Sequence, residues 1–257
     1  MSKHYLNVNY DGTIFEWSKD ASEGFVKYTN TAGKESYRKY YNKGVEGKLI
    51  CINKKNNPNL HNREEIEIVL EGENDTTYNL NFVVYGQDNF LDTYTEHLVK
   101  YLPSLERGIV YNINNWFIKK GDVINNEVAE RNVKGITIKV NGEKIKPALT
   151  QTYTKTDGEK VIGDIPAIEW KEKNGVSKPT AASKEIKSDY LYDVLAENSE
   201  RLKWVGTNTA TQASPQSTPP APVAETPKNS VPTASPADAF EPATDVKQED
   251  FQDLPFN

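Results

Sequence analysis

The chain has 257 residues, which suffice for one large domain or two small ones, with 36% hydrophobic and 26% charged residues. It contains no run of about 18 apolar residues and no apolar signal segment near residue 1, so we expect a cytoplasmic protein rather than a secreted or membrane one. Its net charge of −6 is uneven, because residues 205–257 hold seven acidic and two basic residues, or −5, and leave residues 1–204 close to neutral.

Eight alternating or β-rich segments make up most of residues 1–204. Most are separated by turns that contain Gly, Asn or Asp. The stretches "VLEGENDTTY" and "KVNGEKI" are typical of hairpin connections, and the second holds the Asn-Gly pair favoured in type I′ turns. The predicted strands lie within residues 5–10, 12–17, 47–53, 65–71, 77–86, 108–120, 135–142 and 165–172.

Two helices are predicted between and after these strands. The first, Phe90 to Leu102, stops at Pro103 and has one apolar face. The second, Ser183 to Val205, has Ser183 as a candidate N-cap and Gly206 as a candidate stop. The predicted apolar faces are Leu91, Tyr94, Leu98 and Leu102 in the first helix, and Ile186, Tyr190, Val194 and Leu202, widened by Leu191 and Leu195, in the second.

Short strands with one helix in mid-chain favour a mainly β fold. We expect an OB-fold-like barrel, small and closed, with insertions, one or two helices and a disordered C-terminal tail. The expected organisation is a barrel domain at residues 1–182, a helix at 183–205, a disordered linker at 206–248 and an acidic tip at 249–257. The linker is rich in Pro, Ala, Thr and Ser and cannot bury enough apolar surface to fold.

The densest basic stretch runs from Lys34 to Arg63, with eight basic and two acidic residues, or +6. Tyrosines are threaded through it in "KESYRKYYNKG". Cations that neutralise phosphates and flat rings that stack unpaired bases are what a single-stranded nucleic acid requires. A solvated loop whose tyrosines pack on the body is the alternative. The candidate residues are Tyr28, Lys34, Tyr37, Arg38, Lys39, Tyr40, Tyr41, Lys43, Lys48, Lys54 and Lys55.

A second candidate binding segment is "NNWFIKKGD". Alternation along a strand puts an aromatic residue beside a lysine on each face, so Trp116, Phe117, Lys119 and Lys120 join the candidates. Trp116 as a core residue is the alternative. Residues 131–146, with five basic residues and one acidic residue, form either another wall of a groove or the polar face of a hairpin.

Catalytic motifs are absent from the sequence. There is no P-loop, no GxSxG, no HExxH and no paired CxxC, so we expect no catalytic residue, no cofactor and no metal. The single cysteine, Cys51, excludes an internal disulfide and is flanked by isoleucines, as expected of a buried small hydrophobe. The carboxylates between Glu64 and Asp75 leave a metal-dependent nuclease as an alternative.

The last residues, "EDFQDLPFN", place large apolar side chains after a linker that has very few of them. The stretch "DFQDLPF" resembles the acidic tip of bacterial and phage single-stranded DNA-binding proteins, and Asn257 extends one residue past the usual terminal Phe. The resemblance implies partner binding by Asp250, Phe251, Asp253, Leu254, Pro255 and Phe256.

Together these features lead us to expect a non-enzymatic, phage-encoded protein that binds single-stranded DNA in the host cytoplasm. It would coat and protect the strand in replication, recombination and repair and recruit other replication or recombination proteins through its tip. The alternatives are an adaptor whose β domain binds protein or glycan, and the nuclease. The oligomeric state and the preference for DNA over RNA stay open.

Overall fold

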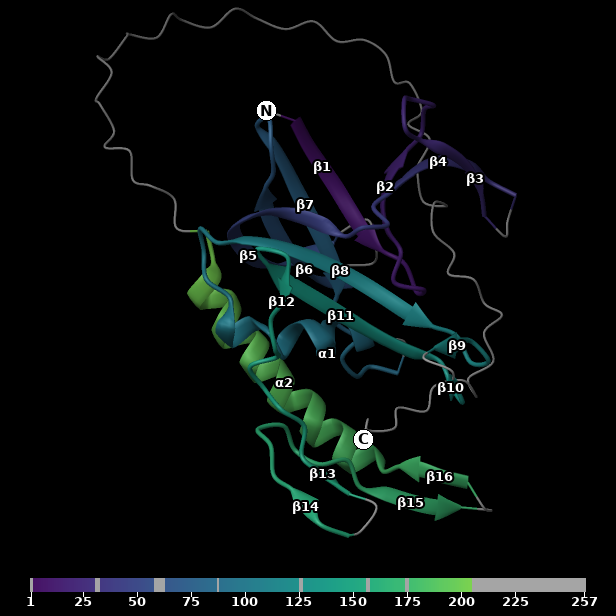
Figure 1. Ribbon diagram of the computed structural model, residues 1–257, viewed down its shortest axis with the longest axis vertical. Helices are drawn as coiled ribbons and strands as arrows, with labels where there is room; N and C mark the ends of the chain where they lie inside the picture. Colours follow the sequence, from purple (N-terminus) through teal and green to yellow (C-terminus); the bar gives the residue numbers. More distant parts are fainter. Residues whose placement is uncertain are drawn as a thin grey trace, which may run out of the picture. The chain divides into compact units, whose positions relative to one another are not determined.

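The computed structural model describes most of the first 204 residues (Figure 1). The expected linker at 206–248 and the tip at 249–257 lie outside the described residues. Within the described part the protein is mainly β with two α-helices, as the sequence predicted. Neither of these helices is both long enough and apolar enough to cross a lipid bilayer. The described residues are 2–30, 33–57, 63–86, 88–124, 127–155, 158–173 and 176–204.

Ten strands form one large sheet, in which neighbouring strands are antiparallel except for β1 and β7, which are parallel. Three short hairpins lie outside it: β9 (Val123–Ile124) with β10 (Glu127–Val128), β13 (Tyr153–Thr154) with β14 (Lys160–Val161), and β15 (Trp170–Lys173) with β16 (Val176–Pro179). The order in the large sheet is β12 (Glu143–Lys144), β11 (Val133–Val140), β8 (Val110–Ile118), β5 (Val45–Asn57), β6 (Arg63–Glu71), β7 (Thr76–Val83), β1 (Ser2–Val8), β2 (Ile14–Ser18), β4 (Glu35–Tyr40) and β3 (Val26–Thr29).

Five of these strands and one helix follow the order of an OB-fold. β5, β6 and β7 form an antiparallel meander, α1 (Thr93–Val99) follows, and β8 and β11 form a hairpin that returns to pair β8 with the start of β5. Among the described strands no ladder joins β7 to β11. Instead α1 contacts both, with Thr95 Oγ1 donating to the carbonyl of Val83 at 2.5 Å. The barrel is therefore open at this seam, whereas the sequence predicted a closed one.

The strand β5 bends and changes its partner. Its first residues pair with β8, those from Lys48 onward pair with β6, and the register shifts between Leu49 and Cys51. A Cβ atom on Gly47 would lie 2.9 Å from the carbonyl oxygen of Glu71, so glycine permits the close approach of β5 and β6 at the bend. Cys51 is buried beside this bulge, as expected of a small hydrophobe.

The core follows the alternation predicted from the sequence. Ile66, Ile68 and Leu70 on β6 have no exposed surface, and Leu80 and Phe82 on β7 pack into the same cluster. The intervening β6 residues lie on the outer face of the sheet. Both predicted hairpin connections are present. Between β11 and β12, Asn141 and Gly142 have positive φ angles of 52° and 82°, as a type I′ turn requires.

The first predicted helix is present but shorter than expected. α1 begins after Asp92, whose side chain accepts a hydrogen bond from the backbone N–H of Tyr94 at 2.9 Å. It ends at Val99, and Pro103 lies in the following 3₁₀ turn η2 (Leu102–Ser104). The predicted apolar face is confirmed, because Leu91, Tyr94, Leu98 and Leu102 are all buried.

The second helix, α2 (Ala181–Leu202), begins two residues earlier than predicted and ends three residues earlier. Thr180 is its N-cap and accepts a hydrogen bond from the backbone N–H of Ser183 at 3.2 Å, so the prediction of Ser183 as the cap was wrong. Threonine takes this role because its β-region backbone precedes the first helical turn. At the other end, the side chain of Arg201 donates to the carbonyls of Leu102 and Leu105 and ties α2 to η2.

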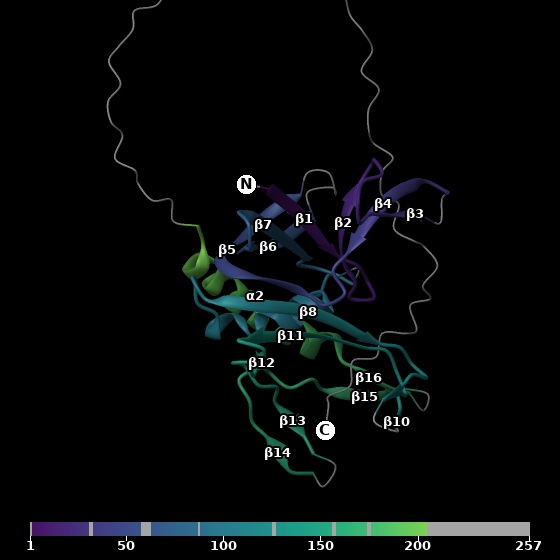
Figure 2. The same ribbon diagram turned by 45° about the horizontal axis from the view of Figure 1, so that its top comes forward.

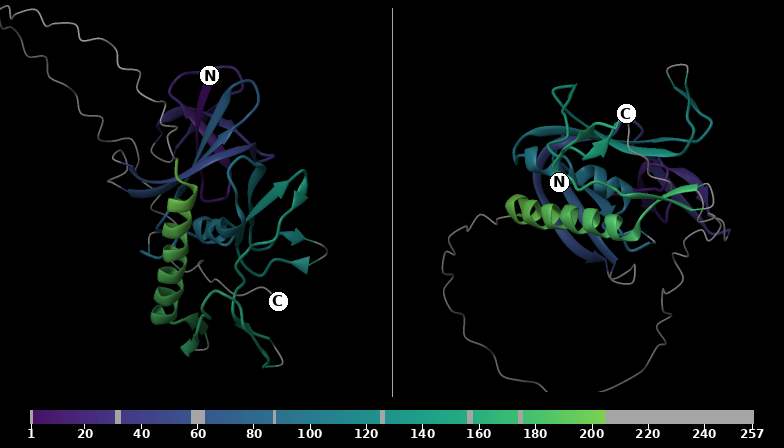
Figure 3. Two further views of the ribbon diagram at one scale, coloured as in Figure 1. Left: turned by 90° about the vertical axis from the view of Figure 1, so that its left-hand side faces the viewer. Right: turned by 90° about the horizontal axis from the view of Figure 1, so that it is seen from below.

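The buried face of α2 is rotated from the predicted one. Leu191, Leu195 and Leu202 are buried, whereas Ile186 is 59% exposed. The buried side chains are those that meet β5, η2 and α1, and α2 lies beside α1 (Figure 3). A small residue, Ser188, meets the start of α1 there, and its hydroxyl accepts a hydrogen bond from the backbone N–H of Leu91.

Strands β2, β4 and β3 extend the sheet beyond the OB-like unit (Figure 2). β1 connects them to this unit through its parallel pairing with β7. β3 and β4 were not predicted as strands, because the segment was interpreted only as a basic, tyrosine-rich stretch. This extension positions most of the tyrosines that the sequence singled out.

Candidate nucleic-acid interface

The three lysines that the sequence placed on β5 are paired with glutamates of β6. Lys54 lies 2.6 Å from Glu64 and Lys55 lies 2.7 Å from Glu67. A third ion pair joins Lys48 and Glu71. The antiparallel register brings the basic stretch and the acidic segment that follows it side by side, so their charges cancel locally. These lysines are weaker candidates for binding phosphates than the sequence suggested.

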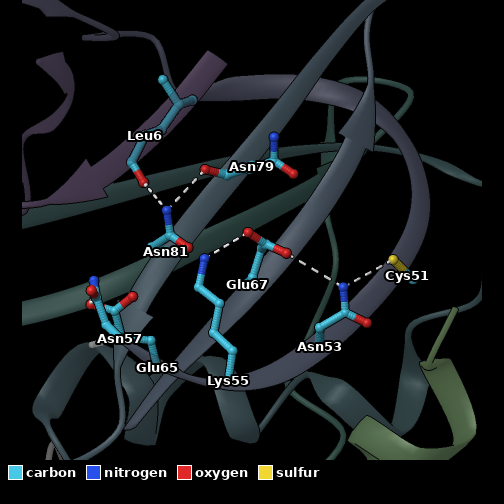
Figure 4. A network of polar contacts seen from close by, with 9 residues as sticks. All are labelled: Leu6, Cys51, Asn53, Lys55, Asn57, Glu65, Glu67, Asn79 and Asn81. Carbon is cyan, nitrogen blue, oxygen red and sulfur yellow. Dashed lines mark hydrogen bonds and ion pairs between the residues drawn. The ribbon is translucent and has the colours of Figure 1, made fainter. Parts of the chain in front are cut away.

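The outer face of β5, β6 and β7 carries several separate sets of polar contacts (Figure 4). The amide of Asn53 donates to Glu67, and that of Asn57 donates to Glu65 at 3.0 Å. The amide of Asn81 donates to the backbone carbonyl of Leu6 at 3.0 Å. In an OB-fold the face of the second and third strands, here β6 and β7, commonly binds the ligand. Here its carboxylates disfavour a phosphate backbone.

The same pairing weighs against the nuclease alternative. Glu64, Glu67 and Glu71 are each held by a lysine, and the described residues contain no group of three potential metal ligands. Burial raises the pKa of the Cys51 thiol, which therefore stays protonated rather than acting as a thiolate nucleophile.

The tyrosine-rich segment forms β4 and its neighbouring turns, and its side chains alternate between two faces. Arg38 and Tyr40 lie on one face, and Tyr37 and Lys39 on the other. Tyr41, just past the strand, belongs with the second group. Its hydroxyl donates to Glu16 at 3.2 Å, and burial together with this carboxylate raises the pKa of Tyr41 strongly. The prediction from the sequence placed Tyr37, Arg38, Lys39, Tyr40 and Tyr41 on a single binding surface, whereas the structure divides them between two faces.

Aromatic residues of the neighbouring strands join Arg38 and Tyr40. On β2, Trp17 pairs with Arg38 and Phe15 pairs with Tyr40. On β3, Tyr28 pairs with Ser36, two residues before Arg38. On β1, Asn7 pairs with Phe15, so alternation places Tyr5 on the same face beside Trp17. We call this surface the aromatic face; it comprises Tyr5, Phe15, Trp17, Tyr28, Arg38 and Tyr40.

The aromatic face is open to solvent. Tyr5 is 56% exposed, Trp17 39% and Tyr40 38%, which is unusual for side chains that a core would bury. Arg38 lies between two of the remaining rings, with its Cζ atom 4.2 Å from the centre of Phe15 and 3.4 Å from that of Tyr28. Exposed rings around one cation combine both of the features that single-strand binding requires.

Further cations lie at both ends of β4. Lys34 is exposed in the turn before the strand, where its backbone N–H donates to Asn30, and Lys43 is exposed after it. Neither forms an ion pair with another described residue. Because exposed cations attract phosphates over several ångströms, these two lysines stay candidates for the electrostatic part of binding.

The end of β8 holds a second, smaller cluster. Trp116 and Phe117 lie on opposite faces, and the indole of Trp116 covers Gly135, where a Cβ atom would lie 2.1 Å from the ring. The ring of Phe117 is 5.9 Å from that of Tyr10, over which Lys134 Nζ lies at 3.5 Å. Lys119 and Lys120 are exposed at the following turn.

Some site residues escaped the sequence analysis. Tyr5, Phe15 and Trp17 join the aromatic face only through strand pairing, and Tyr10 joins the β8 cluster through its contacts with Phe117 and with Lys134, a residue of the basic segment 131–146. The predicted partner-binding residues 250–256 lie outside the described residues. A comparison of the chain with known protein families, curated proteins and solved structures finds no match.

Proposed function

We propose that the chain is a non-enzymatic single-stranded DNA-binding protein that coats DNA during replication, recombination or repair. The observation that carries the proposal is the aromatic face, where the exposed rings of Tyr5, Trp17 and Tyr40 share one face of the adjacent strands β1, β2 and β4 with Arg38, next to the OB-like unit. Each base stacked on such a ring contributes about 1–3 kcal/mol with little dependence on sequence. A coating protein needs such tolerance.

The position of the rings favours an unpaired strand over a duplex. The exposed rings lie on β1, β2 and β4, and neighbouring strands of a sheet are about 4.8 Å apart. Successive bases of an unpaired strand can therefore reach successive rings. In a duplex the flat faces of the bases are stacked on one another and are not available. No described helix carries a basic face of the kind that reads a major groove.

The acidic C-terminal tip adds a second role to the proposal. Residues 250–256 would dock into a pocket on a replication or recombination protein, with Phe256 in an apolar site and Asp253 facing a cation. In the free protein the anionic tail would compete with DNA for the binding surface at an effective concentration in the millimolar range. DNA binding would then release the tip. We place such a protein in the host cytoplasm, encoded by a phage.

An equilibrium titration tests the proposed function. Labelled oligo-dT is added to the full chain and to residues 1–204 at low salt, and fluorescence anisotropy reports binding. We expect both proteins to bind, the shorter one more tightly, and the affinity to fall steeply with salt. Absence of binding by both folded proteins would overturn the proposal. Binding of protein or glycan but not DNA would support the adaptor, and cleavage that requires Mg²⁺ would support the nuclease.

A further inference from the structure

The guanidinium of Arg38 has no polar partner in the described part of the protein. Its Nε atom is buried without a hydrogen bond, and no described residue forms a hydrogen bond or an ion pair with the group. A guanidinium carries five N–H donors in a fixed plane, and a buried donor left unsatisfied is costly. Because Nε itself is covered, an acceptor from outside the folded chain would meet the two terminal nitrogens of the guanidinium, for which the described residues supply no polar partner.

The position of the guanidinium is fixed by two aromatic rings. Phe15 comes from β2 and Tyr28 from β3, the strands on either side of β4, so the cation lies between two rings that restrict its movement. The nearby carboxylates are engaged elsewhere. Glu16 contacts His4 and Tyr41 on the opposite face, and Glu35 is paired with Lys27 at 2.5 Å.

We infer that Arg38 is a fixed fork for one phosphodiester of the bound strand. Arginine donates two parallel hydrogen bonds to phosphate, and a fork already held flat loses less conformational entropy on binding than a mobile side chain. Phe15 and Tyr28 are then positioning residues. The exposed rings of Tyr5, Trp17 and Tyr40 take the bases on either side of this phosphate. The inference rests on the proposed function and assigns separate roles within the aromatic face.

The choice of ligand follows from the surroundings of Arg38. The carboxylate of an acidic peptide would also supply a pair of oxygen atoms. Such a peptide does not provide a regular series of flat groups that could stack on the exposed rings of adjacent strands. A nucleic-acid strand supplies both the phosphate and the bases. An isolated phosphate ion would leave the rings exposed. A single strand of nucleic acid is therefore the ligand that can contact both the guanidinium of Arg38 and the exposed rings of this face.

Protein variants test this role in the full chain. R38Q should weaken oligo-dT binding at least tenfold and lower the slope of log affinity against log salt by about 0.7. R38K should keep the slope but lose several-fold in affinity, because an ammonium ion cannot form the fork. The matched control is R107Q, whose arginine donates to the carbonyl of Lys203 beside α2. Equal effects of R38Q and R107Q would overturn the inference.

Chemically modified DNA gives a test that leaves the protein unchanged. A series of oligo-dT molecules is made with one phosphodiester at a time replaced by a neutral methylphosphonate. We expect one position to weaken binding of the wild-type chain several-fold and to have little effect on R38Q. Equal sensitivity of both proteins at every position would contradict the role of Arg38. Failure of the wild-type chain to bind any oligo-dT would instead remove the proposed function itself.

Discussion

At the scale of single residues, the alternation of side chains along β4 decides which tyrosines can bind a ligand. Tyr28, Arg38 and Tyr40 were predicted from composition alone and do lie on one exposed face. Tyr41 was predicted on the same grounds, yet it is bound to Glu16 on the other face. A basic, tyrosine-rich segment indicates the chemistry of a surface, but only strand register shows which half of it faces outward.

The two faces of β4 provide a matched pair of substitutions. Tyr40→Leu should weaken oligo-dT binding between about 5-fold and 100-fold, because one stacked base is lost. Tyr37→Leu removes the same chemical group from the opposite face and should change affinity less than about twofold. Anisotropy titrations of both variants, with thermal unfolding as the control for folding, give the comparison. A larger loss for Tyr37→Leu would place the DNA on the other face.

At the scale of elements, the contact between α1 and α2 depends on a partly buried ionic cluster. Glu96 of α1 lies 2.8 Å from Lys187 of α2 and 3.0 Å from Lys100. Burial alone would raise the pKa of Glu96, but the two lysines outweigh it and hold the pKa well below the ordinary range. The carboxylate therefore stays charged and joins the helices.

Removing this charge should loosen the docking of α2. Glu96→Gln leaves Lys100 and Lys187, which are only 15% and 12% exposed, without their counter-ion, and should cost about 2–4 kcal/mol of unfolding free energy. Glu200→Gln, in an exposed pair with Lys203, is the control and should cost less than about 0.5 kcal/mol. Urea denaturation measures both. Equal costs would show that the cluster does not hold the helices together.

A neighbouring histidine, His97, should make the folded chain less stable in acid. Burial and, next, Lys100 lower the pKa of His97 to about 4 from an ordinary value of 6.5. Between pH 6.5 and pH 4 the unfolded chain binds a proton at His97 that the folded chain does not. Protonation of His97 therefore leaves the stability of the fold unchanged above pH 6.5 and lowers it progressively as pH falls to 4. The loss should be on the order of 2–3 kcal/mol.

The substitution His97→Gln isolates this effect. Urea denaturation of the variant should show a shallower decline in stability between pH 6.5 and pH 4 than the wild-type chain. Above pH 7 His97 is neutral in both the folded and the unfolded wild-type chain. The dependence of stability on pH should therefore be nearly the same in the wild type and the variant there. A decline of the same steepness in both proteins would show that another group is responsible.

At the level of elements, local sequence patterns predict some features of the fold and not others. The alternating strands, the apolar face of α1 and the Asn-Gly turn follow from local patterns, and all are present. The pairing of Lys55 with Glu67 does not follow from any local pattern, because the two residues meet only through the β5–β6 register. The buried face of α2 also depended on the elements it packs against, β5, η2 and α1, rather than on its own periodicity.

At the scale of the whole molecule, the protein combines an OB-like unit with an added set of strands. The exposed rings of the aromatic face, Tyr5, Trp17 and Tyr40, lie on β1, β2 and β4, outside the five strands of that unit. The face that OB-folds commonly use holds carboxylates paired with lysines. We therefore expect the DNA strand to bind on the added strands β1, β2 and β4, a surface that is distant in sequence from the acidic tip.

The tip gives a prediction that is independent of the DNA-binding surface. Phe256→Ala should leave the affinity for oligo-dT within about twofold of the wild-type value, because this ring would contact a partner protein. Affinity capture of replication proteins with the full chain as bait should be lost in the variant. Phe240→Ala, the same substitution within the linker, is the control and should capture partners normally. Undiminished capture by Phe256→Ala would count against the role of the tip.

The most direct test of the central claim is a map of the residues that touch the strand. Oligonucleotides that contain photoreactive 5-bromouracil are bound to the full chain and irradiated, and the cross-linked peptides are identified by mass spectrometry. We expect cross-links at Tyr5, Trp17 and Tyr40 on the aromatic face. Cross-links confined to the outer face of β6 and β7, or none in a protein that binds the oligonucleotide, would contradict it.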